Sequence, residues 1–168
     1  VQSTVNRASK ILAEEITKEK KIEKLKTIAL ETVDIKGIGM YTLGPIRKSL
    51  SDNEKITYNS LFKKYFLKSF SDRLAEYTNP EIDVLGRKVL NENYTIVNSI
   101  LKAKGDRPEI KIDWRIYTKD PENPLIRDLI IEGLSLARTQ KEEFSSILSS
   151  NNDDINFLFD ALKKFSQN

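Results

Sequence analysis

The segment Ile110-Lys111-Ile112-Asp113-Trp114-Arg115-Ile116-Tyr117 alternates between apolar and polar side chains along its whole length. A period of two is typical of a β-strand, because successive side chains point to opposite faces of a sheet. One face therefore carries three isoleucines and the single tryptophan, while Lys111, Asp113 and Arg115 lie on the other. The segment predicts a strand with one face on an apolar core.

Similar segments flank this strand on both sides. The predicted strands span residues 82–90 (with a break near Gly86), 94–103, 110–117 and 125–133. A turn cluster rich in glycine and proline, 104–108, and a loop with two prolines, 119–124, separate the later strands. Short links between successive strands favour an antiparallel meander.

Helical periodicity replaces strand periodicity at both ends of the chain. The predicted helices span residues 3–16, 19–32, 51–77, 138–149 and 155–162, and short helical turns joined by Gly37, Gly39 and Gly44 fill residues 34–50. Ser51 and Glu54 have the spacing of a capping box at the start of the long helix. Asn79-Pro80 is expected to end it.

This order of elements predicts a single α+β domain over residues 1–168. Its parts are helical over 3–78, sheet over 81–133 and helical again over 137–165. About four antiparallel strands would pack against the N- and C-terminal helices, with an apolar pocket between the layers.

Composition excludes several kinds of site. The chain has no cysteine and no histidine, which removes thiol chemistry and the usual nucleophile–histidine pairs. The net charge of +3 is too balanced to indicate nucleic-acid binding. No stretch approaches the ~18 apolar residues of a membrane span. The chain starts at Val1 rather than Met, as it would after removal of an export signal or after any other truncation.

The long helix carries an unusual number of aromatic residues on one broad stripe. Tyr58, Phe62, Tyr65, Phe66 and Phe70 recur at intervals of three and four residues. Periodicity alone leaves two interpretations open: a filled core, or one wall of an apolar pocket.

Four segments together resemble one known family. They are Met40–Gly44; Phe62–Phe66 with Arg73–Tyr77; Ile112–Arg115; and Asp128–Leu136 followed by Thr139-Gln140 and Glu143-Phe144. In this order and at this spacing they resemble the MlaC/Ttg2D (toluene-tolerance) family over roughly residues 5 to 165. An aromatic residue expected shortly after Gly44 is absent, and Arg47 stands near its place.

The resemblance implies a phospholipid carrier of the periplasm that serves a lipid ABC transport system and maintains outer-membrane lipid asymmetry. It also implies an α+β fold with a pocket between sheet and helices. The implied partners are phospholipid, an inner-membrane ABC transporter complex with its substrate-binding subunit, and an outer-membrane lipoprotein–porin complex. No cofactor, metal or catalytic residue is implied, and the phospholipid is cargo.

A carrier must hide acyl tails from water, at about 0.8 kcal/mol per CH₂, or on the order of 20 kcal/mol for two tails. The residues expected to line its pocket are Leu43, Ile46, Leu61, Phe62, Tyr65, Phe66, Ile96, Ile100, Ile112, Trp114 and Ile116. The headgroup is expected near the mouth, beside Arg47 or Arg73.

Two other functions remain open from the sequence. One is an enzyme that acts on an apolar small molecule, for which Asp113, Glu132 and Ser135 are candidates, although structural roles are expected for all three. The other is an interaction module whose aromatic helix docks a partner; it predicts an exposed apolar patch instead of a cavity.

Overall fold

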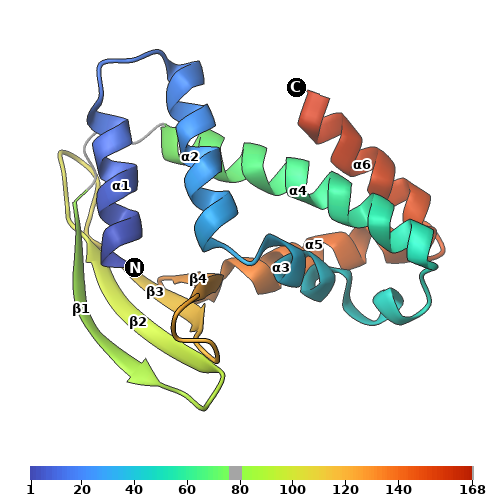
Figure 1. The fold of residues 1–168 in the computed structure, drawn as a ribbon. Helices are drawn as coiled ribbons and strands as arrows, with labels where there is room; N and C mark the ends of the chain where they lie inside the picture. Colours follow the sequence, from blue (N-terminus) through green and yellow to red (C-terminus); the bar gives the residue numbers. More distant parts are fainter. Residues whose placement is uncertain (76–80, 168) are drawn as a thin grey trace. The chain divides into compact units, whose positions relative to one another are not determined.

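The computed structural model describes residues 1–75 and 81–167, without the side chains of Gln2, Val5, Ala8 and Ser9 (Figure 1). The helices in these ranges are α1 (Gln2–Ala13), α2 (Lys18–Thr32), α3 (Ile35–Leu43), the 3₁₀ helix η1 (Gly44–Lys48), α4 (Asp52–Ala75), α5 (Leu136–Ser149) and α6 (Ile155–Gln167). The strands are β1 (Ile82–Val89), β2 (Tyr94–Leu101), β3 (Ile110–Tyr117), β4 (Leu125–Ile131) and β5 (Leu134–Ser135).

The strands form one sheet in the order β1-β2-β3-β4-β5, with antiparallel pairing throughout. The α+β class and the meander are therefore confirmed. The short fifth strand is additional to the four predicted. It arises because Glu132 (φ 50°) and Gly133 (φ 82°) make a two-residue turn that brings Leu134 opposite Ile131. Positive φ at both central residues is the geometry of a type I′ hairpin.

The register defines two faces of the sheet. The apolar face carries Leu101, Ile112, Trp114 and Ile116 at its centre, with seven partly buried residues around them: Val1, Ile82, Val97, Ile110, Ile126, Leu129 and Ile131. The opposite face mixes apolar and charged side chains, and we call it the mixed face. Residues that pair across antiparallel strands share a face. Asp113 and Arg115, which pair with Asn98 and Ile96, thus point away from Trp114, as predicted.

The predicted break near Gly86 is a β-bulge in β1. The pairing with β2 shifts between Val84 and Gly86, so Leu85 is an extra residue on the edge strand. Leu85 is 63% exposed. A bulge of this kind twists an edge strand and hinders its pairing with another chain.

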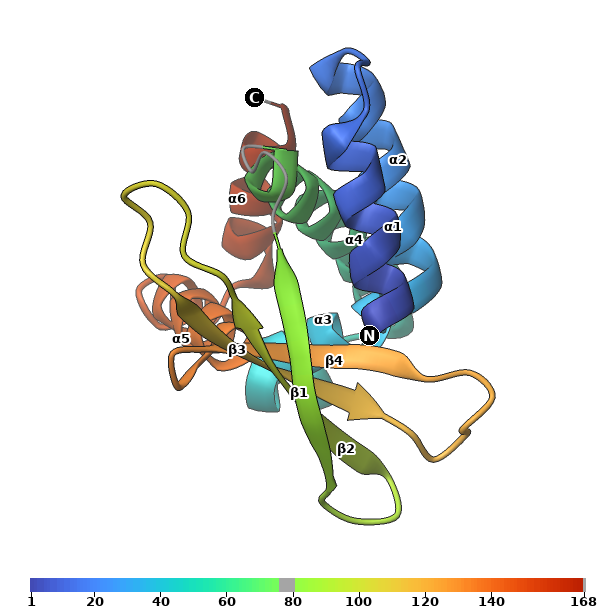
Figure 2. The ribbon, with the colours of Figure 1, turned by 90° about the vertical axis from the view of Figure 1, so that its left-hand side faces the viewer.

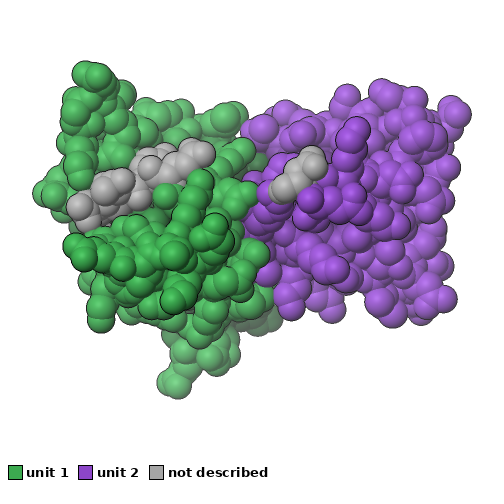
Figure 3. All heavy atoms as spheres, turned by 90° about the horizontal axis from the view of Figure 1, so that it is seen from above, with its two compact units in different colours: residues 1–34, 70–136 green, residues 35–69, 137–168 purple. Residues whose placement is uncertain are grey.

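Backbone contacts divide the chain into two compact units, each built from two separate segments (Figure 3). Unit 1 comprises residues 1–34 and 70–136, which are α1, α2, the end of α4 and the strands. Unit 2 comprises residues 35–69 and 137–168, which are α3, η1, most of α4, nearly all of α5, and α6.

In unit 1, α1 and α2 lie side by side as an antiparallel pair (Figure 2). The side chains of Leu12, Leu25 and Ala29 are buried, with exposed fractions of 0 to 2%. The end of α2 is tied to the sheet, because Val33 forms a parallel bridge with Ile126 and the Asp34 backbone N–H donates to the Ile126 carbonyl over 2.9 Å.

In unit 2, α3 is a continuous helix, which corrects the prediction of short turns joined by glycines. Gly39 has a packing role: a Cβ at this position would lie 2.7 Å from Phe62 Cδ1. The helix ends where the chain needs a left-handed residue, Gly44 (φ 65°).

The predicted start of the long helix is confirmed. The Ser51 backbone N–H donates to Glu54 Oε1 over 2.9 Å, and the Glu54 backbone N–H donates to Ser51 Oγ over 3.1 Å. These are the two reciprocal bonds of a capping box. The predicted helix end near Tyr77 and the Asn79-Pro80 break fall outside the described residues.

Candidate functional site

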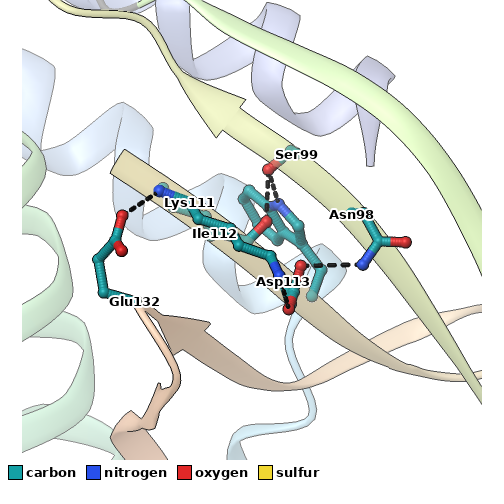
Figure 4. Close-up of polar contacts among 7 residues, drawn as sticks. Asn98, Ser99, Lys111, Ile112, Asp113 and Glu132 are labelled. Carbon is teal, nitrogen blue, oxygen red and sulfur yellow. Dashed lines mark hydrogen bonds and ion pairs between the residues drawn. The ribbon is translucent and has the colours of Figure 1, made fainter. Parts of the chain in front are cut away.

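A pair of hydrogen bonds anchors the centre of the apolar face in unit 1. The Trp114 indole N–H donates to Ser99 Oγ over 2.8 Å, and Ser99 Oγ donates to the Ile112 carbonyl over 2.7 Å (Figure 4). Ser99 is 1% exposed and Trp114 is 9% exposed. The only polar atom of the tryptophan is thus satisfied inside the sheet layer, so its ring presents hydrocarbon alone.

The five strand residues predicted to line a pocket do not share one surface. Ile112, Trp114 and Ile116 are buried on the apolar face. Ile96 pairs with Arg115, and Ile100 pairs with Lys111, so both lie on the mixed face. This corrects the expectation that they belong to the same wall. Val97, opposite Trp114, and Leu101, opposite Ile110, are the apolar residues of β2 on the apolar face.

On the mixed face, the candidate catalytic residues Asp113, Glu132 and Ser135 make hydrogen bonds that stabilise the sheet. Asn98 Nδ2 donates to Asp113 Oδ1 over 2.9 Å, and the Lys111 backbone N–H donates to Glu132 Oε1 over 2.5 Å (Figure 4). Ser135 Oγ donates to Asp128 Oδ2. Each of these polar groups stabilises a neighbouring strand or turn.

A depression of about 210 Å³ lies on this mixed face. Its lining residues are Leu85, Asn98, Ser99, Ile100, Glu109, Lys111 and Glu132. Pockets for drug-sized ligands occupy roughly 300–1,000 Å³ and are mostly apolar. The depression is smaller and carries three charged side chains, so it does not suit acyl tails.

Aromatic rings form the centre of unit 2. Phe62 lies 5.7 Å from Tyr58, 6.1 Å from Phe66 and 6.3 Å from Phe144, between ring centroids. Tyr65 lies 5.8 Å from Phe144. These are favourable ring separations, and α4 supplies four of the five rings.

A buried hydroxyl pair closes this aromatic cluster on the side of α3. Thr42 Oγ1 donates to the Gly39 carbonyl over 2.6 Å, so the Tyr58 hydroxyl donates to Thr42 Oγ1 over 2.7 Å. Tyr58 is 0% exposed. Burial, which disfavours the phenolate, raises the pKa of Tyr58 well above its ordinary value of 10.0.

The raised pKa of Tyr58 predicts a loss of stability in alkali. The unfolded tyrosine ionises near pH 10 and the folded one does not, so this contribution is complete below pH 10 and is lost above it. The free energy of unfolding should fall by up to about 1.4 kcal/mol per pH unit above pH 10, and Tyr58→Phe should lack this component. Urea unfolding at a series of pH values measures the free energy of unfolding of wild type and of Tyr58→Phe. Tyr41→Phe, at an exposed position, is the control. Equal slopes for wild type and Tyr58→Phe would contradict the assignment.

The six lining residues predicted in unit 2 fall into two groups. Leu43 (1% exposed) and Phe62 (2% exposed) are surrounded by protein atoms. Ile46, Leu61, Tyr65 and Phe66 are half-buried. The filled-core interpretation therefore applies to Leu43 and Phe62, while the other four retain open surface.

The arginines expected near a headgroup have separate surroundings. Arg47 Nη1 donates to the Gly44 carbonyl over 3.2 Å, within unit 2, and Arg73 is an exposed residue assigned to unit 1. The sequence did not indicate a cation–aromatic cluster in unit 1. There the Arg115 guanidinium lies 4.4 Å from the Tyr94 ring centre, and Arg127 lies 4.8 Å from that of Tyr117 and pairs with Asp34. Its members come from three strands and from the link after α2, so no local motif could reveal it.

Two features are absent from the described ranges. Across residues 1–75 and 81–167, no helix is both long and apolar enough to cross a bilayer. The same residues contain no group of three or more side chains able to hold a metal ion.

Comparison with known proteins identifies a matching family and a similar solved structure. The family model described as MlaC protein matches residues 2–164. Among solved structures, the chain is similar to a phospholipid-binding protein from Ralstonia solanacearum, determined in complex with a phospholipid. The TM-score is 0.82 at 16% identity, and the alignment covers 99% of this chain and 94% of the other. At this identity, the likeness establishes the fold.

Proposed function

Because this chain belongs to the MlaC family, we propose that it is a periplasmic carrier that binds a phospholipid by its acyl tails. It would shuttle this cargo between an outer-membrane lipoprotein–porin complex and an inner-membrane lipid ABC transporter with its substrate-binding subunit. The observation that carries the proposal is the match of the family model to residues 2–164. The phospholipid bound to the similar Ralstonia protein supports the choice of cargo.

In unit 1 the apolar face of the sheet is the proposed surface for the tails. Tail binding requires hydrocarbon without unpaired polar atoms, because each buried and unpaired polar group costs about 1–3 kcal/mol. Trp114 meets this condition through its bond to Ser99. Half-buried Val97 offers open surface here in place of Ile96 and Ile100. The buried residues Leu101, Ile112, Trp114 and Ile116 support it from within the apolar face.

In unit 2 the residues with open surface are proposed to contact the lipid tails. Ile46, Leu61, Tyr65 and Phe66 are half-buried, so part of each side chain is available to a lipid tail. Leu43 and Phe62 support these residues from within the core.

A carrier needs no chemistry on its cargo, and the proposal assigns none. The residues considered for catalysis are engaged in hydrogen bonds that hold the mixed face together, as for Asp113 with Asn98 and Glu132 with Lys111. Stoichiometric lipid without turnover is the behaviour expected of this chain.

Native mass spectrometry of the purified chain, followed by solvent extraction, tests the proposal. We expect about one phospholipid per protein. A lipid-free chain that also fails to take up phospholipid from vesicles would contradict it and favour an interaction module. Turnover of an acyl substrate would favour an enzyme.

A further inference from the structure

Unit 2 carries an exposed group of lysines around one aromatic ring. Its members are Lys64 and Lys68 on α4 and Lys163, Lys164 and Phe165 on α6, and we call them the basic–aromatic cluster. Phe165 is 39% exposed, and Lys64, Lys163 and Lys164 are exposed. The two helices are shown in green and red in Figure 1.

Two contacts place the Phe165 ring. Its centroid lies 4.7 Å from that of Tyr65, and Lys68 Nζ lies 5.4 Å from its centre. Lys64 precedes Lys68 by one helical turn, so both lysines lie on the same side of α4. The ring is thus backed by the Tyr65 side chain and has the Lys68 ammonium group beside it.

The charge of this region is clearly positive. From Leu61 to Ser69, α4 carries three lysines and no carboxylate. α6 carries two lysines against the single carboxylate of Asp160, one turn before Lys164. Two further carboxylates adjoin this side. Asp72 follows Lys68 by one turn of α4, and Glu143 of α5 is connected through Gln140, whose Nε2 donates to it over 3.1 Å and whose Oε1 accepts from the Tyr65 hydroxyl.

We propose that the basic–aromatic cluster binds the surface of an anionic membrane. Lysines beside an exposed aromatic ring are the combination that lies at membrane interfaces, where the ring enters the headgroup layer and the ammonium groups meet phosphates. Clusters of four or more lysines on a helical surface favour anionic lipids, and each adds roughly fivefold to partitioning. Four of the five side chains are exposed, and they come from two helices, an arrangement that suits a deformable, flat partner.

This inference goes beyond the proposed function, which assigns no membrane contact to the chain. A carrier that exchanges tails with a bilayer gains from brief residence at its surface, and a few lysines with one ring give reversible binding. Vesicle binding tests the basic–aromatic cluster, and co-purified lipid tests the tail-binding surface, so either proposal can fail without the other.

Co-sedimentation with vesicles of phosphatidylcholine, with and without phosphatidylglycerol, tests the inference on the full chain. Wild type is expected to bind only the anionic vesicles, and high salt should weaken binding because exposed charges are screened. Lys64→Glu/Lys164→Glu is expected to reduce binding at least tenfold, and Phe165→Ala several-fold. The control is Lys10→Glu/Lys20→Glu, which makes the same change in net charge on exposed positions of unit 1 and should bind like wild type.

Three results would overturn the inference. They are equal binding by wild type and Lys64→Glu/Lys164→Glu, equal loss in the control, and no binding of wild type to anionic vesicles at low salt while polyglutamate is bound. The last result would assign the cluster to an acidic polypeptide. Co-purified lipid is measured for every variant: full retention with lost vesicle binding confirms the cluster alone, and wild type without lipid contradicts only the carrier proposal.

Discussion

Val97→Glu is expected to abolish retention of a co-purified phospholipid, whereas Ile96→Glu is expected to leave it intact. The two residues are adjacent and half-buried on β2, but Val97 lies opposite Trp114 on the apolar face and Ile96 opposite Arg115 on the mixed face. A carboxylate against lipid tails has no partner and costs about 3 kcal/mol or more, which weakens binding more than 100-fold. Beside Arg115 the same carboxylate meets a cation.

Native mass spectrometry of both variants gives the comparison, and circular dichroism with thermal unfolding establishes that each is folded. Lipid loss in folded Ile96→Glu together with full loading of folded Val97→Glu would reverse the assignment of the faces. Equal loading of both would place the tails away from this part of the sheet.

Phe62→Ala is expected to lower the free energy of unfolding of the lipid-free chain by about 3–5 kcal/mol, because it removes a ring that protein atoms surround. For a chain of this length the melting temperature should fall by about 10 °C. Thermal and urea unfolding after lipid removal measure the effect. The ring contacts Tyr58, Phe66 and Phe144 and fills the space beside Gly39, so the cavity cannot close without moving α3.

Phe66→Ala is the matched control, one turn further along α4 and half-buried. We expect a smaller loss of stability and a larger loss of lipid retention than for Phe62→Ala. If the two variants lose equal stability, the division of the aromatic stripe into core and lining residues is wrong.

The sequence predicted β3 well because its pattern is unambiguous. All apolar residues of Ile110–Tyr117 except Tyr117 share one parity, so the buried face could be identified before the structure. β2 offers no such information: Ile96 and Ile100 have one parity, while Val97 and Leu101 have the other. Only the pairing of Val97 with Trp114 decides the face, and pairing depends on a contact between strands.

The glycines of α3 show a second feature that local sequence could not predict. Gly37 and Gly39 were interpreted as breaks because glycine destabilises an isolated helix by about 1 kcal/mol. The structure keeps the helix through both, and at Gly39 the missing side chain makes room for Phe62, which lies 23 positions further along the chain. Gly44, with φ of 65°, is a true break, and Pro45 directly after it is a local signal that the other two glycines lack.

The position of the aromatic stripe of α4 follows from the sequence, but which of its rings are enclosed does not. Periodicity placed Phe62, Tyr65 and Phe66 on one side of the helix, and their ring contacts agree with this. Which ring is enclosed depends on α3 and α5, since Phe144 and Gly39 close around Phe62. A helical period cannot contain that information.

The interleaving of the two units along the chain sets the order in which they can form. The meander of unit 1 is local, because each strand pairs with its neighbour in sequence, so it can fold as soon as it is synthesised. Unit 2 has to wait: its two segments, 35–69 and 137–168, flank residues 70–136, and the loop between them must close before α4 meets α5 and α6. Until then the aromatic stripe of α4 lacks its cover, and exposed apolar surface of this kind favours aggregation of a nascent chain.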